Sequence, residues 1–154
     1  MKNRKPVIGE AFRADMGDPE HTFHSLMFEL QYYGPRRFKR LIAACRAMAE
    51  AIEASPDDMP EGHDDLISEV CDALTDWART HNEFLSFGTL ADYPDCFGFS
   101  VDVESALSEA DFRISDLAEL PKGATGLAVH VNDHGNVSAY RCARGRAYEL
   151  FAVV

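Results

Sequence analysis

The sequence predicts a single α+β domain over residues 1–154, in which N-terminal helices pack on a C-terminal antiparallel β-meander. Three features predict it. Apolar residues recur three and four positions apart through the first half of the chain, which is the period of an α-helix. Apolar and polar residues alternate over residues 126–154, which is the period of a β-strand. A length of 154 residues suits one domain with its own core.

Three helices are expected, over residues of about 20–33, 35–54 and 62–81. The first begins after Asp18, because Asp is a good helix cap and the following Pro19 fits the first helical position. Gly34 ends this helix and Pro35 starts the next. An Asp/Pro-rich turn then separates the second helix from the third. The apolar stripes of these two helices are expected to face each other in an antiparallel hairpin.

The segments around the helices are less regular. Residues 1–18 are expected to form an extended arm with room for one short strand. Five aromatic residues between Phe84 and Phe99 alternate with Gly and Pro, which predicts a long loop held to the core by its rings; the alternative is a recognition surface. Alternation over residues 97–103 and 112–114 predicts short strands, with a short helix over residues 103–110 between them.

The C-terminal meander is predicted to have three strands, over residues 126–131, 137–142 and 147–154. The first connection, residues 132–136, has the Asn, Asp and Gly that hairpin turns favour. The second connection contains Gly145 between two arginines. Because the final strand ends on apolar residues, we expect it to be buried.

The net charge of −11 is distributed unevenly. Residues 50–119 contain nineteen acids and only two bases, for a local charge of −17. The rest of the chain contains seven acids and thirteen bases, for +6. A strongly negative field repels nucleic acid and attracts basic proteins, so direct nucleic-acid binding is disfavoured and a basic protein partner is expected.

The four cysteines are far apart in the sequence and form no C-x-x-C pair. No apolar run reaches the length of a membrane span, and the first residues lead into no hydrophobic signal segment. We therefore expect a cytoplasmic protein with reduced thiols and no membrane association.

The third helix carries the main candidate surface. Four of its acids are spaced four, three and four residues apart, which places them in one line along the helix. With three neighbouring acids they form the predicted partner-binding set: Asp57, Asp58, Asp64, Asp65, Glu69, Asp72 and Asp76. The second helix has a basic face near its start, where cations oppose the helix dipole: Arg36, Arg37, Lys39, Arg40 and Arg46. This face is interpreted either as a solvated counter-charge to the acids or as a contact for phosphate.

No metal and no cofactor is the primary expectation, although two sets of side chains have suitable chemistry. His21 and His24 share a helix face and could hold two corners of a zinc site, but no third ligand lies at a known spacing. Two acid pairs could bind magnesium: Glu50 with Glu53, and Glu69 with Asp72. Their E-x-x-E and E-x-x-D spacing resembles that of the all-α nucleoside triphosphate pyrophosphatases of the MazG type. The resemblance covers only the helix pair, and it implies that acids from adjacent helices hold Mg²⁺ on the phosphates of a nucleotide.

The chain has no G-x-S-x-G, G-x-G-x-x-G or G-x-x-x-x-G-K-[ST] motif, which favours a non-enzymatic function. We expect an acidic interaction protein that imitates the charge of nucleic acid and blocks a basic, nucleic-acid-binding partner. By analogy of charge alone, this is the behaviour of phage- or plasmid-type inhibitors of the anti-defence or anti-CRISPR class. One alternative is a Mg²⁺-dependent pyrophosphatase-like enzyme that uses the helix carboxylates. The other is a structural homo-oligomer, such as a homodimer formed through the helix pair or the edge of the terminal sheet.

Overall fold

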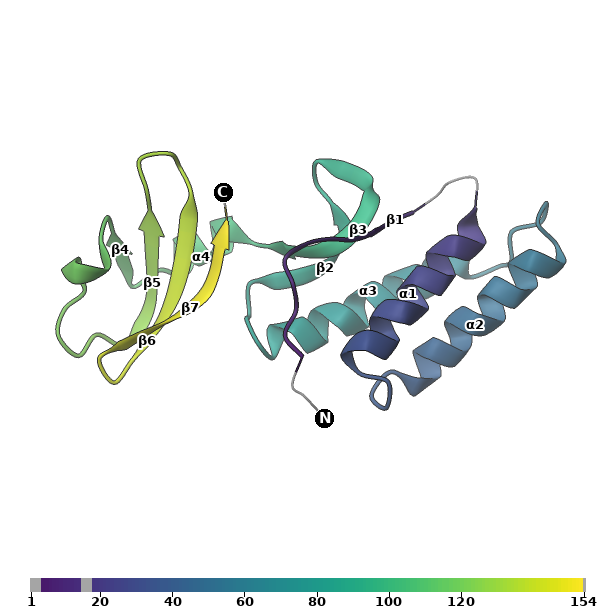
Figure 1. Ribbon diagram of the computed structural model, residues 1–154, viewed down its shortest axis with the longest axis horizontal. Helices are drawn as coiled ribbons and strands as arrows, with labels where there is room; N and C mark the ends of the chain where they lie inside the picture. Colours follow the sequence, from purple (N-terminus) through teal and green to yellow (C-terminus); the bar gives the residue numbers. More distant parts are fainter. Residues whose placement is uncertain (1–3, 15–17, 154) are drawn as a thin grey trace. The chain divides into compact units, whose positions relative to one another are not determined.

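The computed structural model describes residues 4–14 and 18–153 (Figure 1). The fold class is α+β, as predicted. The chain divides into two compact units, residues 1–100 (unit 1) and residues 101–154 (unit 2), and each is described here by itself. The prediction of a single domain stays a prediction. Among the described residues, none of the helices is long and apolar enough to cross a membrane.

Unit 1 contains the three predicted helices, α1 (Pro19–Tyr33), α2 (Lys39–Ala54) and α3 (His63–Arg79). The cap predicted for α1 is present, because the Asp18 side chain accepts a hydrogen bond from the backbone N–H of His21 at 3.1 Å. The second helix begins at Lys39, four residues later than expected, because residues 35–38 form a turn. In that turn the backbone N–H of Phe38 donates to the carbonyl of Gly34 at 2.9 Å.

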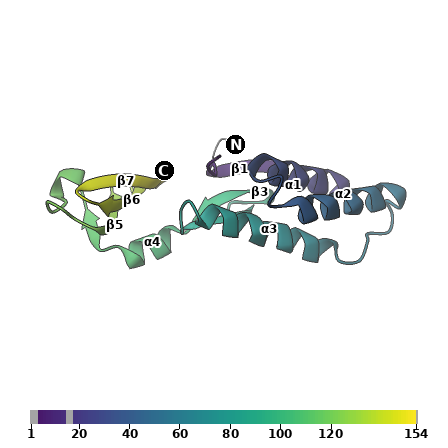
Figure 2. The ribbon, with the colours of Figure 1, turned by 90° about the horizontal axis from the view of Figure 1, so that it is seen from below.

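The packing of the helices differs in part from the prediction. Helix α2 packs chiefly on α1, whereas α3 packs chiefly on strand β2 (Leu85–Leu90), so the apolar stripes of α2 and α3 face these partners more than each other. The two helices still run antiparallel (Figure 2). Each buries its predicted stripe: Leu41, Cys45, Ala49 and Ile52 on α2, and Leu66, Val70, Leu74, Trp77 and Ala78 on α3.

Unit 1 also has its own sheet, of strand order β1-β3-β2, with β1 (Gly9–Arg13) antiparallel to β3 (Tyr93–Val101). The short strand expected in the N-terminal arm is therefore confirmed. The prediction of a long loop between Phe84 and Phe99 is wrong, because β2 and β3 occupy most of this segment. Gly98 is needed here, since a side chain at this position would collide with the backbone oxygen of Gly9 on β1.

The rings that the sequence places in a loop instead form the centre of the unit 1 core. Phe99 is 1% exposed, and its ring lies against Tyr33, Trp77 and Phe87 at centroid distances of 5.4, 6.1 and 4.9 Å. These residues come from α1, α3, β3 and β2. The cluster therefore joins α1 and α3 to the sheet, and it explains why β2 and β3 are buried at these rings.

Unit 2 contains α4 (Val103–Glu109), β4 (Phe112–Ile114), a short 3₁₀ helix (Leu117–Glu119), β5 (Gly126–Val131), β6 (Val137–Ala143) and β7 (Arg146–Val153). Strands β5, β6 and β7 form the predicted antiparallel meander. The sheet is nevertheless mixed, because β4 pairs in parallel with β5. The Asp111 carboxylate accepts from the backbone N–H of Leu127 at 2.8 Å, which joins the start of β4 to the start of β5. Gly126 has φ 120°, and a side chain there would collide with this carboxylate.

Candidate interaction surface

The seven predicted partner-binding acids are all solvent-exposed in the structure, and together they are called the acidic surface below. Two of them lie in the turn between α2 and α3, and five lie on α3: Asp57 and Asp58, then Asp64, Asp65, Glu69, Asp72 and Asp76. At 100° per residue, the last four fall within an arc of about 60° on the helix surface. This arc lies opposite the side that buries Val70 and Leu74.

Two of the acids are placed where the helix itself stabilises a negative charge. Asp64 and Asp65 lie in the first turn of α3, at the positive end of its dipole. Asp64 also lies 3.3 Å from the His63 ring, so it gains an ion pair when that histidine is protonated. The acidic surface is therefore compatible with a stable α3, despite the repulsion between like charges three and four residues apart.

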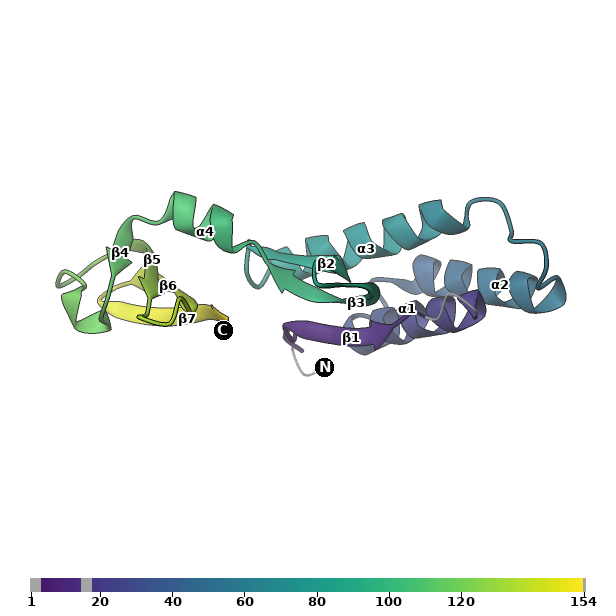
Figure 3. The ribbon, with the colours of Figure 1, turned by 90° about the horizontal axis from the view of Figure 1, so that it is seen from above.

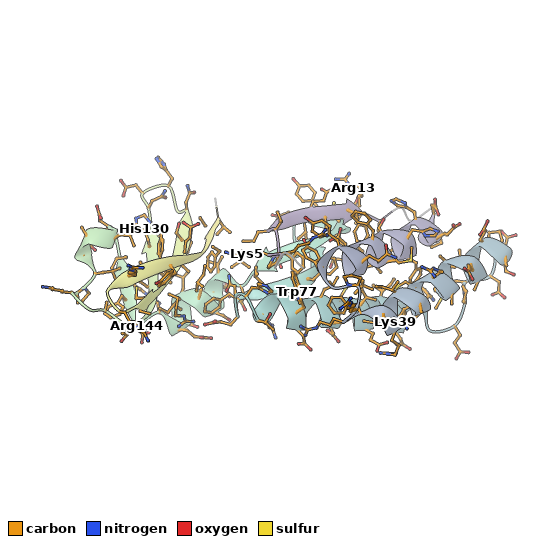
Figure 4. All side chains as sticks on the ribbon, turned by 60° about the horizontal axis from the view of Figure 1, so that its bottom comes forward. Lys5, Arg13, Lys39, Trp77, His130 and Arg144 are labelled. Carbon is orange, nitrogen blue, oxygen red and sulfur yellow. The ribbon has the colours of Figure 1, made fainter. Side chains whose placement is uncertain are left out.

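The predicted basic face meets the acidic surface at one side. Its five cations are exposed: Arg36 and Arg37 lie in the turn before α2, and Lys39, Arg40 and Arg46 lie on α2. Figure 4 marks Lys39 at the start of the helix. Arg40 forms an ion pair with Glu69. Arg37 and Arg40 also line a pocket of about 250 Å³ together with Asp76. Among the described residues, Glu69 is the only member of the acidic surface that pairs with an arginine, so the basic face neutralises the acids only in part.

Exposed acids are concentrated at the end of unit 1 that holds the α2–α3 turn. No Lys or Arg occurs between Arg46 and Arg79 in the sequence. The turn and the adjoining helix ends contribute seven exposed acids: Glu50, Glu53, Asp57, Asp58, Glu61, Asp64 and Asp65. This end of the α2–α3 helix pair therefore carries carboxylates, and residues 47–78 contain no Lys or Arg to neutralise them.

The four magnesium candidates are not brought together. No cluster of three or more His, Cys, Asp or Glu side chains in the described ranges has the geometry of a metal site. The E-x-x-E and E-x-x-D spacing therefore does not produce a shared Mg²⁺ site between α2 and α3.

The zinc candidates His21 and His24 lie on α1, and both are exposed. His24 Nε2 is 3.0 Å from the Glu20 carboxylate, one turn earlier on the same helix. Both histidines line a pocket of about 240 Å³ between α1 and β1. The described side chains supply no third ligand for zinc at this place.

Glu29 lines the same pocket, and sequence reasoning missed it. Its residue is 8% exposed, and burial raises the pKa of its carboxyl group. The signal in the sequence is weak: an acid beside the apolar face of α1 looks solvated until it is known that β1 lies over this side of the helix.

The thiols do not provide a nucleophile in the helix pair. Burial, with smaller contributions from the charges of Glu69 and Asp72 respectively, raises the pKa of Cys45 and of Cys71 to about 11. Both are therefore protonated at neutral pH and unreactive as nucleophiles. All four cysteines are free thiols in the structure.

Unit 2 has a separate pocket of about 510 Å³, between the 3₁₀ helix and the β6–β7 turn. Its walls are mostly apolar, and Lys122 and Arg146 lie among them. In the turn, Arg144 has φ 53°, a left-handed conformation that residues other than Gly, Asn and Asp seldom adopt. None of the predicted site residues lines this pocket.

Comparisons of this chain with models of protein families, with curated proteins and with solved structures find no match.

Proposed function

We propose that this chain is a non-enzymatic interaction protein whose acidic surface binds a basic, nucleic-acid-binding protein and blocks its nucleic-acid site. The observation that carries the proposal is the exposure of all seven acids, of which only Glu69 has an arginine partner within the described residues. The four acids aligned on α3 provide one carboxylate about every 5.5 Å along the helix axis. A DNA strand provides one phosphate about every 3.4 Å of duplex axis, so the acids of the turn are needed to raise the charge density.

The chemistry of such a complex is electrostatic. Lysines and arginines that normally contact phosphates would instead pair with carboxylates, and the attraction would accelerate association. Because the carboxylates are exposed, binding is expected to weaken steeply as ionic strength increases. By analogy of charge, the proposed role is that of an inhibitor from a phage or plasmid acting on a host nuclease or defence complex.

Charge reversal tests the proposal. In the test variant, Asp65, Glu69 and Asp72 are changed together to Lys. In the matched control, Glu109, Asp133 and Glu149 of unit 2 are changed to Lys; these acids are also exposed, so net charge changes equally. Affinity capture from nuclease-treated extract of the source organism, followed by mass spectrometry, compares both with the wild-type chain.

The expected result is a basic nucleic-acid-binding protein that the wild-type chain and the control retain and the test variant loses. This protein should elute at moderate salt, and the wild-type chain should compete with an oligonucleotide for it. Equal retention by the test variant, or a partner that continues to bind its oligonucleotide in the presence of the wild-type chain, would refute the proposal.

A further inference from the structure

The pocket between β1 and α1 is built differently from the acidic surface. It has a volume of about 240 Å³, and six of the side chains that line it carry the inference: Phe12, His21, His24, Ser25, Phe28 and Glu29. Figure 3 shows β1 and α1 on one side of unit 1 and α3 on the other. The pocket is therefore separate from the surface to which we assign partner binding.

Glu29 is the buried charge of this pocket. Its residue is 92% buried, and no salt bridge pairs its carboxylate with a cation among the described residues. No buried side-chain oxygen in the described residues lacks a hydrogen-bond partner, so the unpaired oxygens of Glu29 still open into the pocket. Partial dehydration without a neighbouring cation disfavours the charged form of this carboxylate. A positive charge that enters the pocket would therefore stabilise it.

The two described arginines of the adjoining arm do not supply that charge. Arg13, on β1 (Figure 4), lies 3.5 Å from Asp95 and 3.9 Å from Glu10. Arg4 donates from Nη1 to the backbone carbonyl of Tyr32 at 2.6 Å, and its guanidinium lies 3.9 Å from the centre of the Tyr32 ring. Both guanidinium groups are thus engaged elsewhere.

The walls suit a flat organic cation. The Phe12 ring is fixed by stacking on Phe97, with centroids 5.1 Å apart and planes 6° apart. Phe28 is 62% exposed, its ring stacks on Tyr32 with centroids 6.3 Å apart, and it lines the pocket. Aromatic faces attract cations, and a guanidinium group can stack on a ring while donating two hydrogen bonds to a carboxylate.

We propose that the pocket between β1 and α1 binds the guanidinium group of a ligand, with Glu29 as the carboxylate that pairs with it and the rings of Phe12 and Phe28 as its walls. The pocket is large enough for such a head group and is smaller than a site for a whole drug-sized molecule. The imidazole rings of His21 and His24 and the hydroxyl of Ser25 offer acceptors for the remaining N–H groups.

The test uses the full chain and compares methylguanidinium with methylurea, which is similar in shape but uncharged. Amide chemical shifts of Ala11, Ser25 and Phe28 are followed by NMR during each titration. We expect saturable shifts at these residues with methylguanidinium and none with methylurea. A blocked tripeptide with a central arginine and free agmatine, titrated in parallel, distinguish a protein side chain from a small molecule as the source of the group.

The Glu29→Gln variant should lose at least about tenfold in affinity, since a hydrogen-bonded charge pair is lost. The matched Glu50→Gln variant, which changes an exposed acid on α2, should bind like the wild-type chain. As a second readout, the pKa of the Glu29 carboxyl, followed by ¹³C NMR in the wild-type chain, should decrease when methylguanidinium is present.

Three outcomes would overturn the inference: no saturable shift with methylguanidinium, equal shifts with methylurea, or an unchanged pKa of Glu29 at saturating methylguanidinium. None of these results bears on the acidic surface, because the charge-reversal experiment uses other residues and another readout.

Discussion

The two sides of unit 1 place their carboxylates in contrasting surroundings. On the α3 side, Asp65, Glu69, Asp72 and Asp76 are in contact with water, and their charges are screened and individually inexpensive. On the α1 side, Glu29 lines the pocket beside β1, and its residue is only 8% exposed. The comparison teaches two things. The number of exposed acids in a segment indicates the charge of the partners that it attracts. Burial determines which acid has a pKa that depends most on a neighbouring charge.

The largest effect is expected from reversing the buried charge. In Glu29→Lys an ammonium group replaces the carboxylate in a pocket with two histidines and no described acid in contact with it, so we expect a loss of about 3 kcal/mol or more in the free energy of unfolding. The exposed counterpart, Asp72→Lys, should change that free energy by no more than about 0.5 kcal/mol. Denaturant titration followed by Trp77 fluorescence measures both. Similar effects of the two variants would mean that Glu29 is not buried as described.

An intermediate effect is expected from neutralising the same carboxyl. Burial raises the pKa of Glu29 in the folded state above its unfolded value, so the folded state favours the protonated form. This contribution to stability is fully present below the unfolded pKa of about 4.5 and is lost as the pH rises through the folded pKa. Glu29→Gln should therefore melt higher than the wild-type chain at pH 7.5, by on the order of a few degrees.

The difference in Tm between Glu29→Gln and the wild-type chain should shrink as the pH is lowered toward 4, where both side chains are neutral. Thermal melts at several pH values, with Glu50→Gln as the exposed control, provide the measurement. A difference that is independent of pH would attribute the effect to packing instead of ionisation.

The smallest effect is expected at the ion pair between the basic face and the acidic surface. The side chains of Arg40 and Glu69 are 76% and 46% exposed, so removal of the pair in Arg40→Ala should lower the free energy of unfolding by about 0.5 kcal/mol or less. The loss should disappear at high salt, because exposed charges are screened. Denaturant midpoints at low and high ionic strength test this, with Lys39→Ala as a neighbouring control. A larger loss that persists at high salt would show that Arg40 is a packing residue.

Much of the architecture follows from local sequence patterns. The three helices were predictable because their apolar residues repeat at helical spacing and because Asp18 and Pro19 mark the start of α1. The terminal meander was predictable from alternation and from the turn residues between its strands. These features depend on residues close to one another in the chain.

The remaining features depend on partners distant in the sequence. The β2–β3 hairpin was missed because its Gly and Pro residues look like loop signals, and only the contact of Phe99 with rings from α1 and α3 explains why the segment is buried. The parallel pairing of β4 with β5 is accompanied by the hydrogen bond between Asp111 and Leu127, two residues that no local pattern links. At the candidate sites, the exposure of the acids was predictable from helical spacing, whereas the pairing of Arg40 with Glu69 and the burial of Glu29 required the fold.

Trp77, the only tryptophan of the chain, belongs to unit 1, and its indole lies 4.8 Å from the His81 ring. Tryptophan fluorescence therefore reports the unfolding of unit 1. It does not report the unfolding of the terminal meander in unit 2. Far-ultraviolet circular dichroism samples the backbone of both units. Coincident transitions by the two methods would mean that the units melt as one cooperative block, and separated transitions would mean that each is an independent folding module.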